Sequence, residues 1–239
     1  MENINKPATI KALQLEEADF EAISQYTLVR DFQKEKIFAF KVALCNNEVD
    51  RDKEAFTTEA LKTLAELFKG VTGIQNHSMN SNDQMARIYK TEVVVDETKT
   101  TSYGEPFAEL IAFAYMVKTP GNEELITEIE MGIKKEVSVS CAISEAQCSI
   151  CGRDMRQDRC EHKPGAEYNG AVCFVKLNKP VDAYEWSFVA VPAQIGAGTR
   201  KSKALEEREP YPEAVKPEDK NKSNVKDTLM RAFSIMKGD

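Results

Sequence analysis

Several features that would mark a membrane, secreted or nucleic-acid-binding protein are absent from this sequence. No apolar run approaches the roughly 20 residues that a membrane span needs. Residues 1–23 mix charged and apolar side chains and lack the apolar core of a signal peptide. The net charge of −7 and the pI near 5.2 argue against binding through phosphate neutralisation. We therefore expect a protein of a reducing cytoplasm that binds neither membranes nor nucleic acid.

Histidine is also scarce, and this limits the chemistry that the chain can perform. His77 and His162 are its only two imidazoles. The six cysteines, in a reducing compartment, are expected to be free or bound to metal rather than paired as disulfides. The sequence contains no internal repeat.

What is present predicts an α+β fold. The length of 239 residues and the 42% hydrophobic content suffice for one core with a small insert and tails. β-rich segments predict strands at 36–45, 86–95, 107–117, 135–143, 171–177 and 184–191. Helical spacing predicts helices at 56–68, capped by Thr57 or Thr58 and followed by Gly70, and at 121–133, capped by Asn122. Without regular βαβ alternation, these elements favour a mostly antiparallel or mixed, barrel-like sheet with helices packed around it.

The chain is predicted to contain one main domain, residues 1–199, and a tail, residues 200–239. Within the main domain, residues 148–170 are polar, cysteine-bearing and glycine-rich, so we expect them to leave the core as an insert. The tail is charged and contains proline, and such a composition cannot bury a core. Its last part, 224–238, has the pattern of a short amphipathic helix.

The insert begins with a pattern of metal ligands, CSICGRDMRQDRCEH. Cys148 and Cys151 flank a tight turn that Gly152 permits, and Cys160 with His162 provides a second pair. Three thiolates and one imidazole form a closed tetrahedral site for a structural Zn²⁺. The polar insert has few apolar groups, so a metal would supply stability that it otherwise lacks.

Other interpretations of these cysteines remain open at the level of sequence. The spacer between Cys151 and Cys160 is shorter than in common zinc fingers, and the segment could be a loop with free thiols. A redox Cys-x-x-Cys is disfavoured because no thioredoxin-like βαβ pattern surrounds it. Cys173 could replace one of the four ligands.

If His162 binds metal, His77 is the only imidazole left for acid–base chemistry, although a lone histidine in a polar loop can also be merely solvent-exposed. Serine needs a base to remove its proton before it can act as a nucleophile. The strand-borne candidates are Ser138, Ser140, Cys141 and Ser187. Alternation directs Cys141 away from the face shared by Ser138 and Ser140, but spacing alone does not choose between the two serines.

Four segments of the chain together resemble the tailed-phage prohead protease family, serine peptidases of capsid maturation that are related in fold to herpesvirus assemblin. The segments are NNEVDRDKEAFTTEALKTL, GIQNHSMNSNDQMARI, MGIKKEVSVSC and YEWSFVAVPAQIGAG. They follow one another in the family's order, within residues 36–200. The cysteine-rich segment resembles a zinc-knuckle insert of one branch of such phage proteins. The resemblance therefore implies an assemblin-like fold with a small metal-binding insertion.

The resemblance also implies a catalytic mechanism, in which His77 is the general base and Ser138 the nucleophile of an acyl transfer. Glu185 matches the family's acidic position and would orient His77, with Ser187 as the fallback for this role. Backbone N–H groups would stabilise the oxyanion. The chain departs from the family's pattern at Ser140, where the family has glycine, and at Cys141, where it has an aromatic residue.

The implied substrates are scaffold and major capsid proteins inside an immature procapsid in the host cytoplasm, and the enzyme would also cleave itself. Assemblin-like proteases can depend on dimerisation, so a homo-oligomer is a possible state. Two other hypotheses remain at this stage. One is an inactive, zinc-stabilised capsid-assembly protein of the same fold. The other is a small zinc-binding adaptor without any phage connection.

Overall fold

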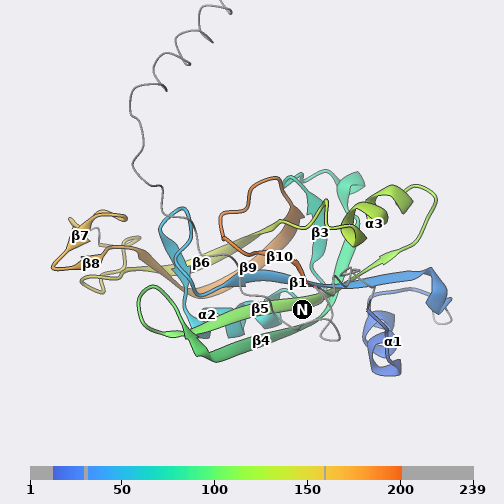
Figure 1. Cartoon of the computed structure of the whole chain (residues 1–239), viewed down its shortest axis with the longest axis horizontal. Coiled ribbons are helices and arrows are strands. Elements are labelled where there is room, and N and C mark those ends of the chain that lie inside the picture. The colour runs from blue at the N-terminus through green and yellow to red at the C-terminus, as the bar shows by residue number, and fades with distance from the viewer. Residues whose placement is uncertain (1–12, 30–31, 159, 201–239) are drawn as a thin grey trace, which may run out of the picture. The chain divides into compact units, whose positions relative to one another are not determined.

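The computed structural model describes residues 13–29, 32–158 and 160–200 (Figure 1). The predicted tail, except for Arg200, lies outside these residues. The α-helices are α1 (Glu17–Ser24), α2 (Thr58–Leu67) and α3 (Glu123–Glu130). The strands are β1 (Ile37–Asn46), β2 (Glu54–Phe56), β3 (Thr72–Gln75), β4 (Ala86–Thr100), β5 (Pro106–Val117), β6 (Val137–Cys148), β7 (Glu167–Tyr168), β8 (Ala171–Val172), β9 (Val175–Phe188) and β10 (Gly198–Arg200).

The main sheet is mixed, as the sequence predicts for an α+β fold. Its strands follow the order β10-β1-β5-β4-β3-β9-β2, and β6 pairs with the other edge of β9. Only the pairs of β9 with β2 and β3 are parallel. The predicted barrel-like closure is not confirmed. β6 pairs with β9 along its whole length. Beside β10, the described residues form only an isolated bridge between Glu136, just before β6, and Gly198, so no ladder closes the ring.

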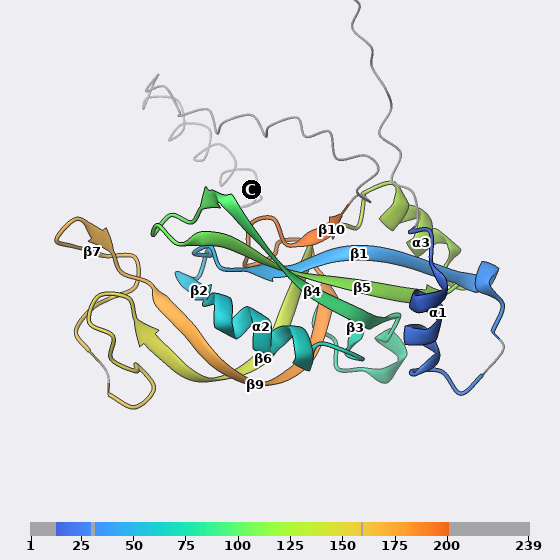
Figure 2. The ribbon, with the colours of Figure 1, turned by 90° about the horizontal axis from the view of Figure 1, so that it is seen from below.

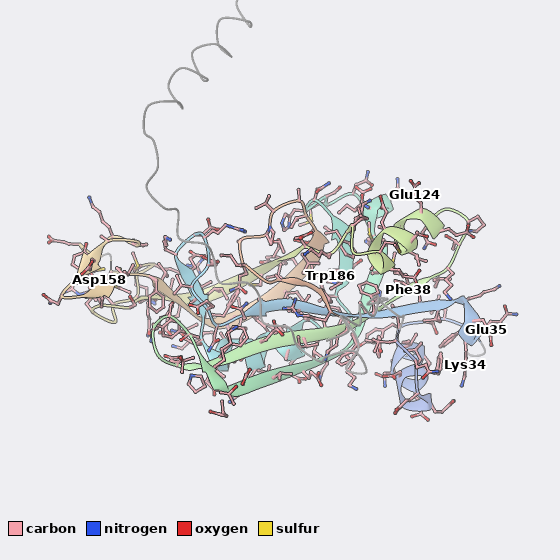
Figure 3. All side chains as sticks on the ribbon, in the orientation of Figure 1. Lys34, Glu35, Phe38, Glu124, Asp158 and Trp186 are labelled. Atoms are coloured by element: carbon pink, nitrogen blue, oxygen red, sulfur yellow. The ribbon has the colours of Figure 1, made fainter. Side chains whose placement is uncertain are left out.

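Strand β1 divides its side chains between two hydrophobic clusters because successive residues point to opposite faces. Phe38, Phe40, Val42 and Leu44 enter the main core, whereas Ile37 and Ala39 pack in a smaller cluster that includes Ile23 of α1. Helix α2 buries its apolar face in the main core and packs against β9, β5 and β4 (Figure 2). Trp186 of β9, fully buried, joins Phe38 in this core (Figure 3).

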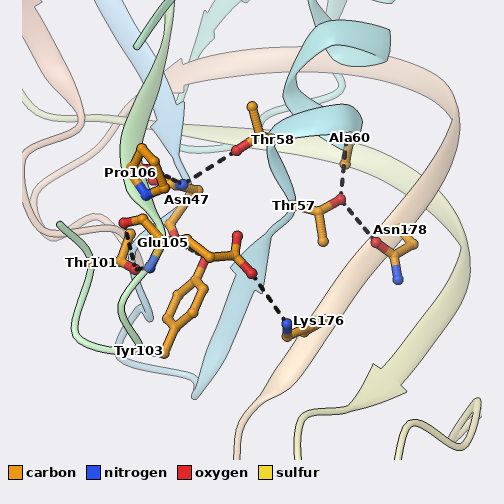
Figure 4. Close-up of polar contacts among 10 residues, drawn as sticks. All are labelled: Asn47, Thr57, Thr58, Ala60, Thr101, Tyr103, Glu105, Pro106, Lys176 and Asn178. Atoms are coloured by element: carbon orange, nitrogen blue, oxygen red, sulfur yellow. Dashed lines mark hydrogen bonds and ion pairs between the residues drawn. The ribbon is translucent and has the colours of Figure 1, made fainter. Parts of the chain in front are cut away.

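The start of α2 is fixed by the threonine that the sequence suggested as a cap. Thr57 Oγ1 accepts the Ala60 N–H at 3.2 Å and donates to Asn178 Oδ1 of β9 at 2.8 Å (Figure 4). Asn47, just after β1, donates to Thr58 Oγ1 and to a backbone carbonyl at the start of β5. The helix is therefore tied to the sheet at its first turn, and Gly70, at φ 80°, follows its end as expected.

Two details of the predicted elements are corrected by the structure. Asn122 occupies the N-cap position of α3, but its side chain bonds to residues before the helix instead of capping it. The two strands expected at 171–177 and 184–191 form mainly one strand, β9. The residues 178–180, Asn-Lys-Pro, form an irregularity within this strand, where Lys179 has φ 50° and Pro180 lies opposite Ile143. Proline is tolerated at such bulges because no ladder hydrogen bond is required of it.

Gly73 of β3 lies against Trp186, its partner residue in β9. A Cβ atom at this position would lie 2.6 Å from Cε2 and 2.9 Å from Cη2 of the indole, and closer still to Cζ2. The fully buried ring has no room to move, so we expect Gly73→Ala to lower the free energy of unfolding by about 3 kcal/mol. Urea denaturation measures this change. Gly121→Ala, which meets nothing closer than 3.9 Å, is the matched control, and equal stability of the two variants would contradict the prediction.

Candidate active site and metal centre

The pairing of β6 with β9 brings four polar residues to one face of the sheet. Ser138 lies directly opposite Ser187, and Ser140 lies directly opposite Glu185. Because side chains alternate along a strand, all four point to the same side, while Trp186 points into the core. The shared face of Glu185 and Ser187 that the sequence predicts is therefore present.

A tight turn after β3 carries His77 to this face. β3 runs parallel to the end of β9, and the Asn76 N–H continues the pairing by donating to the Phe188 carbonyl at 3.0 Å. Asn76 and His77 both have positive φ, 49° and 55°, and the Ser78 N–H closes the turn on the Gln75 carbonyl at 2.9 Å. Positive φ is uncommon for residues other than glycine, so the turn must be stabilised by its surroundings. It exposes His77 towards a cleft while anchoring its backbone.

The imidazole of His77 is held by a buried carboxylate. Nδ1 lies 2.8 Å from Glu185 Oε1, and Glu185 is only 2% exposed. The Ser187 hydroxyl donates to the other carboxylate oxygen, Oε2, at 2.6 Å and also accepts the His77 backbone N–H at 3.0 Å. Both oxygens of the carboxylate are thus hydrogen-bonded, as a buried charged group requires. With Nδ1 donating to Glu185, the second ring nitrogen, Nε2, carries the lone pair that can accept a proton.

The two candidate serines of β6 differ in their contacts with this imidazole. Ser140 Oγ lies 3.3 Å from His77 Nδ1, the nitrogen that also contacts Glu185. The Ser138 hydroxyl makes no hydrogen bond with any described residue. Of the three predicted catalytic residues, the structure brings His77 and Glu185 into contact. Ser138 lies on the same face, but its hydroxyl forms no hydrogen bond with His77 or Glu185.

A cleft of about 660 Å³ runs along β6 beside these residues. It is lined by seven consecutive residues of the strand, 137–143, and by His77. Residues from both faces of β6 share this cleft, which indicates that it follows the strand's open edge. Cys141 also lines it, but burial, aided by the nearby Glu54 carboxyl, raises the pKa of this thiol to about 11. Cys141 is therefore protonated at neutral pH and is a poor rival nucleophile.

Charged residues other than the predicted catalytic residues also line the cleft. Asp50, Asp52 and Glu54 come from the turn before β2 and from its first residue, and Arg156 comes from the cysteine-rich insert. Burial raises the pKa of Asp50 and of Glu54. These residues lie in two of the quoted segments, but the sequence gives no signal that they line one cleft, because the insert and this turn meet only after β2 and β6 have both paired with β9.

The four predicted metal ligands come together at the far end of β6. The ligand atoms of Cys148, Cys151, Cys160 and His162 all lie within 4.8 Å of one another, so the group could hold a metal ion such as zinc. In a tetrahedral site with Zn–S bonds of about 2.3 Å, neighbouring ligand atoms are about 3.8 Å apart, so the widest of these separations would shorten by about 1 Å on binding. After these ligands, the chain forms a small sheet of the two short strands β7 and β8 (Figure 1).

Local chemistry at this cluster also suits a metal. His162 Nδ1 is buried without a hydrogen-bond partner among the described residues. This arrangement costs free energy unless a metal ion or another group binds the nitrogen. Burial acts to raise the pKa of Cys148, but the backbone N–H groups of Cys151 and Ile150 and neighbouring thiols outweigh it and lower the pKa to about 7. The turn itself is closed by the Gly152 N–H, which donates to the Cys148 carbonyl at 2.9 Å.

Cys173, the alternative ligand, adjoins the cluster. Its Sγ lies 3.9 Å from Cys148 Sγ, and the residue is fully buried. It does not belong to the group of four whose ligand atoms all approach one another within 4.8 Å. The structure therefore favours the set of three cysteines and His162, with Cys173 beside it.

Comparison of the chain with protein-family models gave no match, and comparisons with curated proteins and with solved structures gave none either. Among the described residues, no helix is both long enough and apolar enough to cross a membrane. A function for this chain is therefore inferred from the geometry of the site and from the four segments that carry the family resemblance.

Proposed function

We propose that the chain is a serine endopeptidase in which His77 and Glu185 activate a serine of β6. The observation that carries this proposal is the contact of His77 Nδ1 with the buried Glu185 carboxylate, on the sheet face that also carries Ser138 and Ser140. A histidine oriented by a buried carboxylate, beside serines on a cleft, is the arrangement that acyl transfer uses. The fully hydrogen-bonded carboxylate favours one tautomer and one orientation of the ring.

Ser138 is the proposed nucleophile because of the ring nitrogen that remains available. When Nδ1 donates its proton to Glu185, a hydroxyl at Nδ1 has no lone pair to which it can give its own proton. Ser140 lies at that nitrogen, so its role is to help orient the ring. Ser138 lines the cleft, and its hydroxyl has no partner among the described residues that would compete with Nε2.

An oxyanion donor is available on the same strand. The backbone carbonyl of Glu136 accepts a hydrogen bond from the N–H of Val189, the residue just after β9. The Val137 N–H points the other way and donates to the Ala197 carbonyl. Alternation continues this pattern, so the Val139 N–H faces the open edge of β6, next to Ser138. One such donor typically contributes about 3–4 kcal/mol to transition-state stabilisation.

The metal in this proposal is a structural zinc ion bound by Cys148, Cys151, Cys160 and His162. All four protein ligands are supplied, so no position remains for substrate or water. The ion would order the insert, whose polar composition supplies little core of its own. It takes no part in the proton transfers of His77.

The more specific proposal is a prohead maturation protease of assemblin-like fold. Support comes from the four segments that resemble this family, which carry His77, Ser138 and Glu185. The substrates would then be scaffold and major capsid proteins within a procapsid, and the enzyme would act there as a homo-oligomer. An inactive, zinc-stabilised assembly protein is the alternative, and the lack of a hydrogen bond between Ser138 and His77 favours it.

A fluorophosphonate probe, which labels activated serines, tests the proposal on the full-length chain. We expect the wild type to be labelled at Ser138, as located by peptide mass mapping, and Ser138→Ala to lose the label. Ser144→Ala is the matched control, because Ser144 is an exposed serine of the same strand that donates to the Lys179 carbonyl. Labelling at Ser140 would reverse the roles of the two serines. A folded wild type that takes no label would favour the inactive assembly protein.

A further inference from the structure

The loop that follows the metal-binding turn folds back onto β6. The Met155 N–H donates to the Ala146 carbonyl at 2.7 Å, and the Cys148 N–H donates to the Arg153 carbonyl at 2.9 Å. Asp154 forms a bridge with Gln147, and its carboxylate accepts the Ala146 N–H at 3.2 Å. Residues 151–158, here named the knuckle loop, are thus attached to the strand that carries Ser138.

This attachment makes the knuckle loop one wall of the cleft. Ala146 and Arg156 both line the cleft that contains Ser138 and His77. Among the described residues that line the cleft, Arg156 is the only lysine or arginine, and its guanidinium forms no hydrogen bond or ion pair with any described residue. Its backbone, in contrast, is fixed, because the Arg156 N–H donates to Asp154 Oδ1 at 3.1 Å. An unpaired guanidinium on a fixed backbone beside a reactive centre is suited to binding an anionic group.

The metal ligands lie on both sides of this position in the chain. Cys148 and Cys151 precede Arg156, and Cys160 and His162 follow it. A metal ion bound to all four closes the chain around Arg156 into a small ring whose ends are fixed. Apart from a metal, the attachments of the knuckle loop to β6 among the described residues are the backbone hydrogen bonds of Gly152, Arg153 and Met155 and the bond to the Asp154 carboxylate.

We propose that Arg156 binds a carboxylate of the peptide substrate, and that the metal sets the affinity for that substrate by holding the knuckle loop against β6. This inference rests on the proposed peptidase function and names its substrate class, peptides with a carboxylate near the scissile bond. A guanidinium binds a carboxylate through two parallel hydrogen bonds. Asp50, Asp52 and Glu54 also line the cleft, form no ion pair with Arg156, and would repel a substrate carboxylate, so they favour its binding at Arg156.

Metal and substrate are therefore thermodynamically coupled. If bound metal tightens the binding of substrate by some factor, then bound substrate tightens the binding of metal by the same factor. The coupling passes through one residue, so it should disappear when Arg156 is removed. This gives the proposal a signature that a purely structural metal does not share.

The first test compares peptide hydrolysis by the full-length wild type and by Arg156→Ala. The probe is a positional-scanning library of octapeptides with Glu, Gln or Lys at each position, prepared with free and with amidated C-termini. We expect KM to be lower for Glu than for Gln at one position, or for the free than for the amidated terminus, and this identifies the source of the carboxylate. Arg156→Ala should raise KM for the preferred peptides about tenfold, with little change in kcat, and abolish the preference. Arg156→Lys should restore part of it.

Arg153→Ala is the matched control, because Arg153 is an exposed arginine of the same loop whose side chain, among the described residues, pairs only with Asp158 at the surface. Figure 3 labels Asp158 at the outlying end of the insert. Arg153→Ala should keep the preference for the carboxylate. A preference for Lys, no preference in the wild type, or an unchanged preference in Arg156→Ala would each overturn the proposal.

The second test removes the metal with a chelator. We expect KM of the wild type to rise by about the same factor as in Arg156→Ala, whereas KM of Arg156→Ala should change little. Hydrogen exchange provides a readout that does not depend on activity: the amides of residues 152–156 should exchange faster after metal removal, and those of β9 should not. Equal effects of chelation on both enzymes would overturn the coupling.

Fluorophosphonate labelling separates the two proposals, since Arg156→Ala should still be labelled even if its peptide selectivity is lost, whereas failure of the peptidase proposal removes labelling from the wild type itself.

Discussion

Replacing His77 by asparagine is expected to lower kcat/KM for peptide cleavage by a factor of about 10³ or more, because the activating base is lost. Asparagine is the informative substitution, since it tolerates the positive φ of 55° at this position better than alanine does. The turn should therefore keep its shape while Nε2 disappears. Steady-state kinetics on a peptide substrate, together with the fluorophosphonate labelling rate, measures the effect.

Met79→Ala is the matched control for this substitution. Met79 lies in the same loop, is 79% exposed, and does not line the cleft. Its replacement should change kcat/KM by less than about twofold, as is usual for a surface side chain away from the site. Glu185→Gln should fall between the two variants, because the amide retains a hydrogen-bonding group for Ser187 but loses the charge that stabilises a protonated His77. If His77→Asn retained most of the activity, the assignment of the base would be wrong.

The second large effect concerns the metal. We expect the purified full-length protein to contain about one zinc ion per chain, and Cys148→Ser to contain close to none, because a structural site depends on all four of its ligands. Apparent binding free energies of structural zinc are about 10–16 kcal/mol in small zinc-binding peptides at pH 7, so its loss should unfold the insert. Metal analysis measures the first result. Limited proteolysis between residues 151 and 172, with the remaining domain intact, measures the second.

Cys173→Ser is the comparison that this prediction needs. Cys173 is as buried as Cys148 and lies 3.9 Å from it, but it lies outside the group of four converging ligands. The variant should therefore retain its zinc. If Cys173→Ser lost the metal and His162→Ala kept it, the ligand set would be four cysteines instead of three cysteines and a histidine.

The parts of the structure that the sequence predicted well are those determined over short distances along the chain. Thr57 caps α2 because the acceptor and the donor are three residues apart. The metal ligands converge because a turn between Cys148 and Cys151 needs only local bonds and a glycine at positive φ. The face shared by Glu185 and Ser187 follows from the period of two in any strand.

The errors occurred where long-range pairing overrides local preference. The residues 178–180 have the composition of a turn, but pairing with β6 on one side and with β2 before them keeps them within a strand. The barrel-like closure was expected from strand content, which does not specify how many residues of β6 reach β10. These outcomes depend on contacts between residues far apart in the sequence.

The sequence by itself determined which residue types were available: two imidazoles, one cluster of metal ligands, and serines in alternating positions on a β-rich segment. Only the tertiary structure decided how they are used. It placed His77 Nδ1 against Glu185, put Ser140 at that same nitrogen, and brought Arg156 into the cleft. It also left the Ser138 hydroxyl without a hydrogen bond to any residue that the structure describes. The physical reason is that hydrogen-bond geometry depends on positions in space to within fractions of an ångström, and strands β3, β6 and β9 acquire these positions only when they pair.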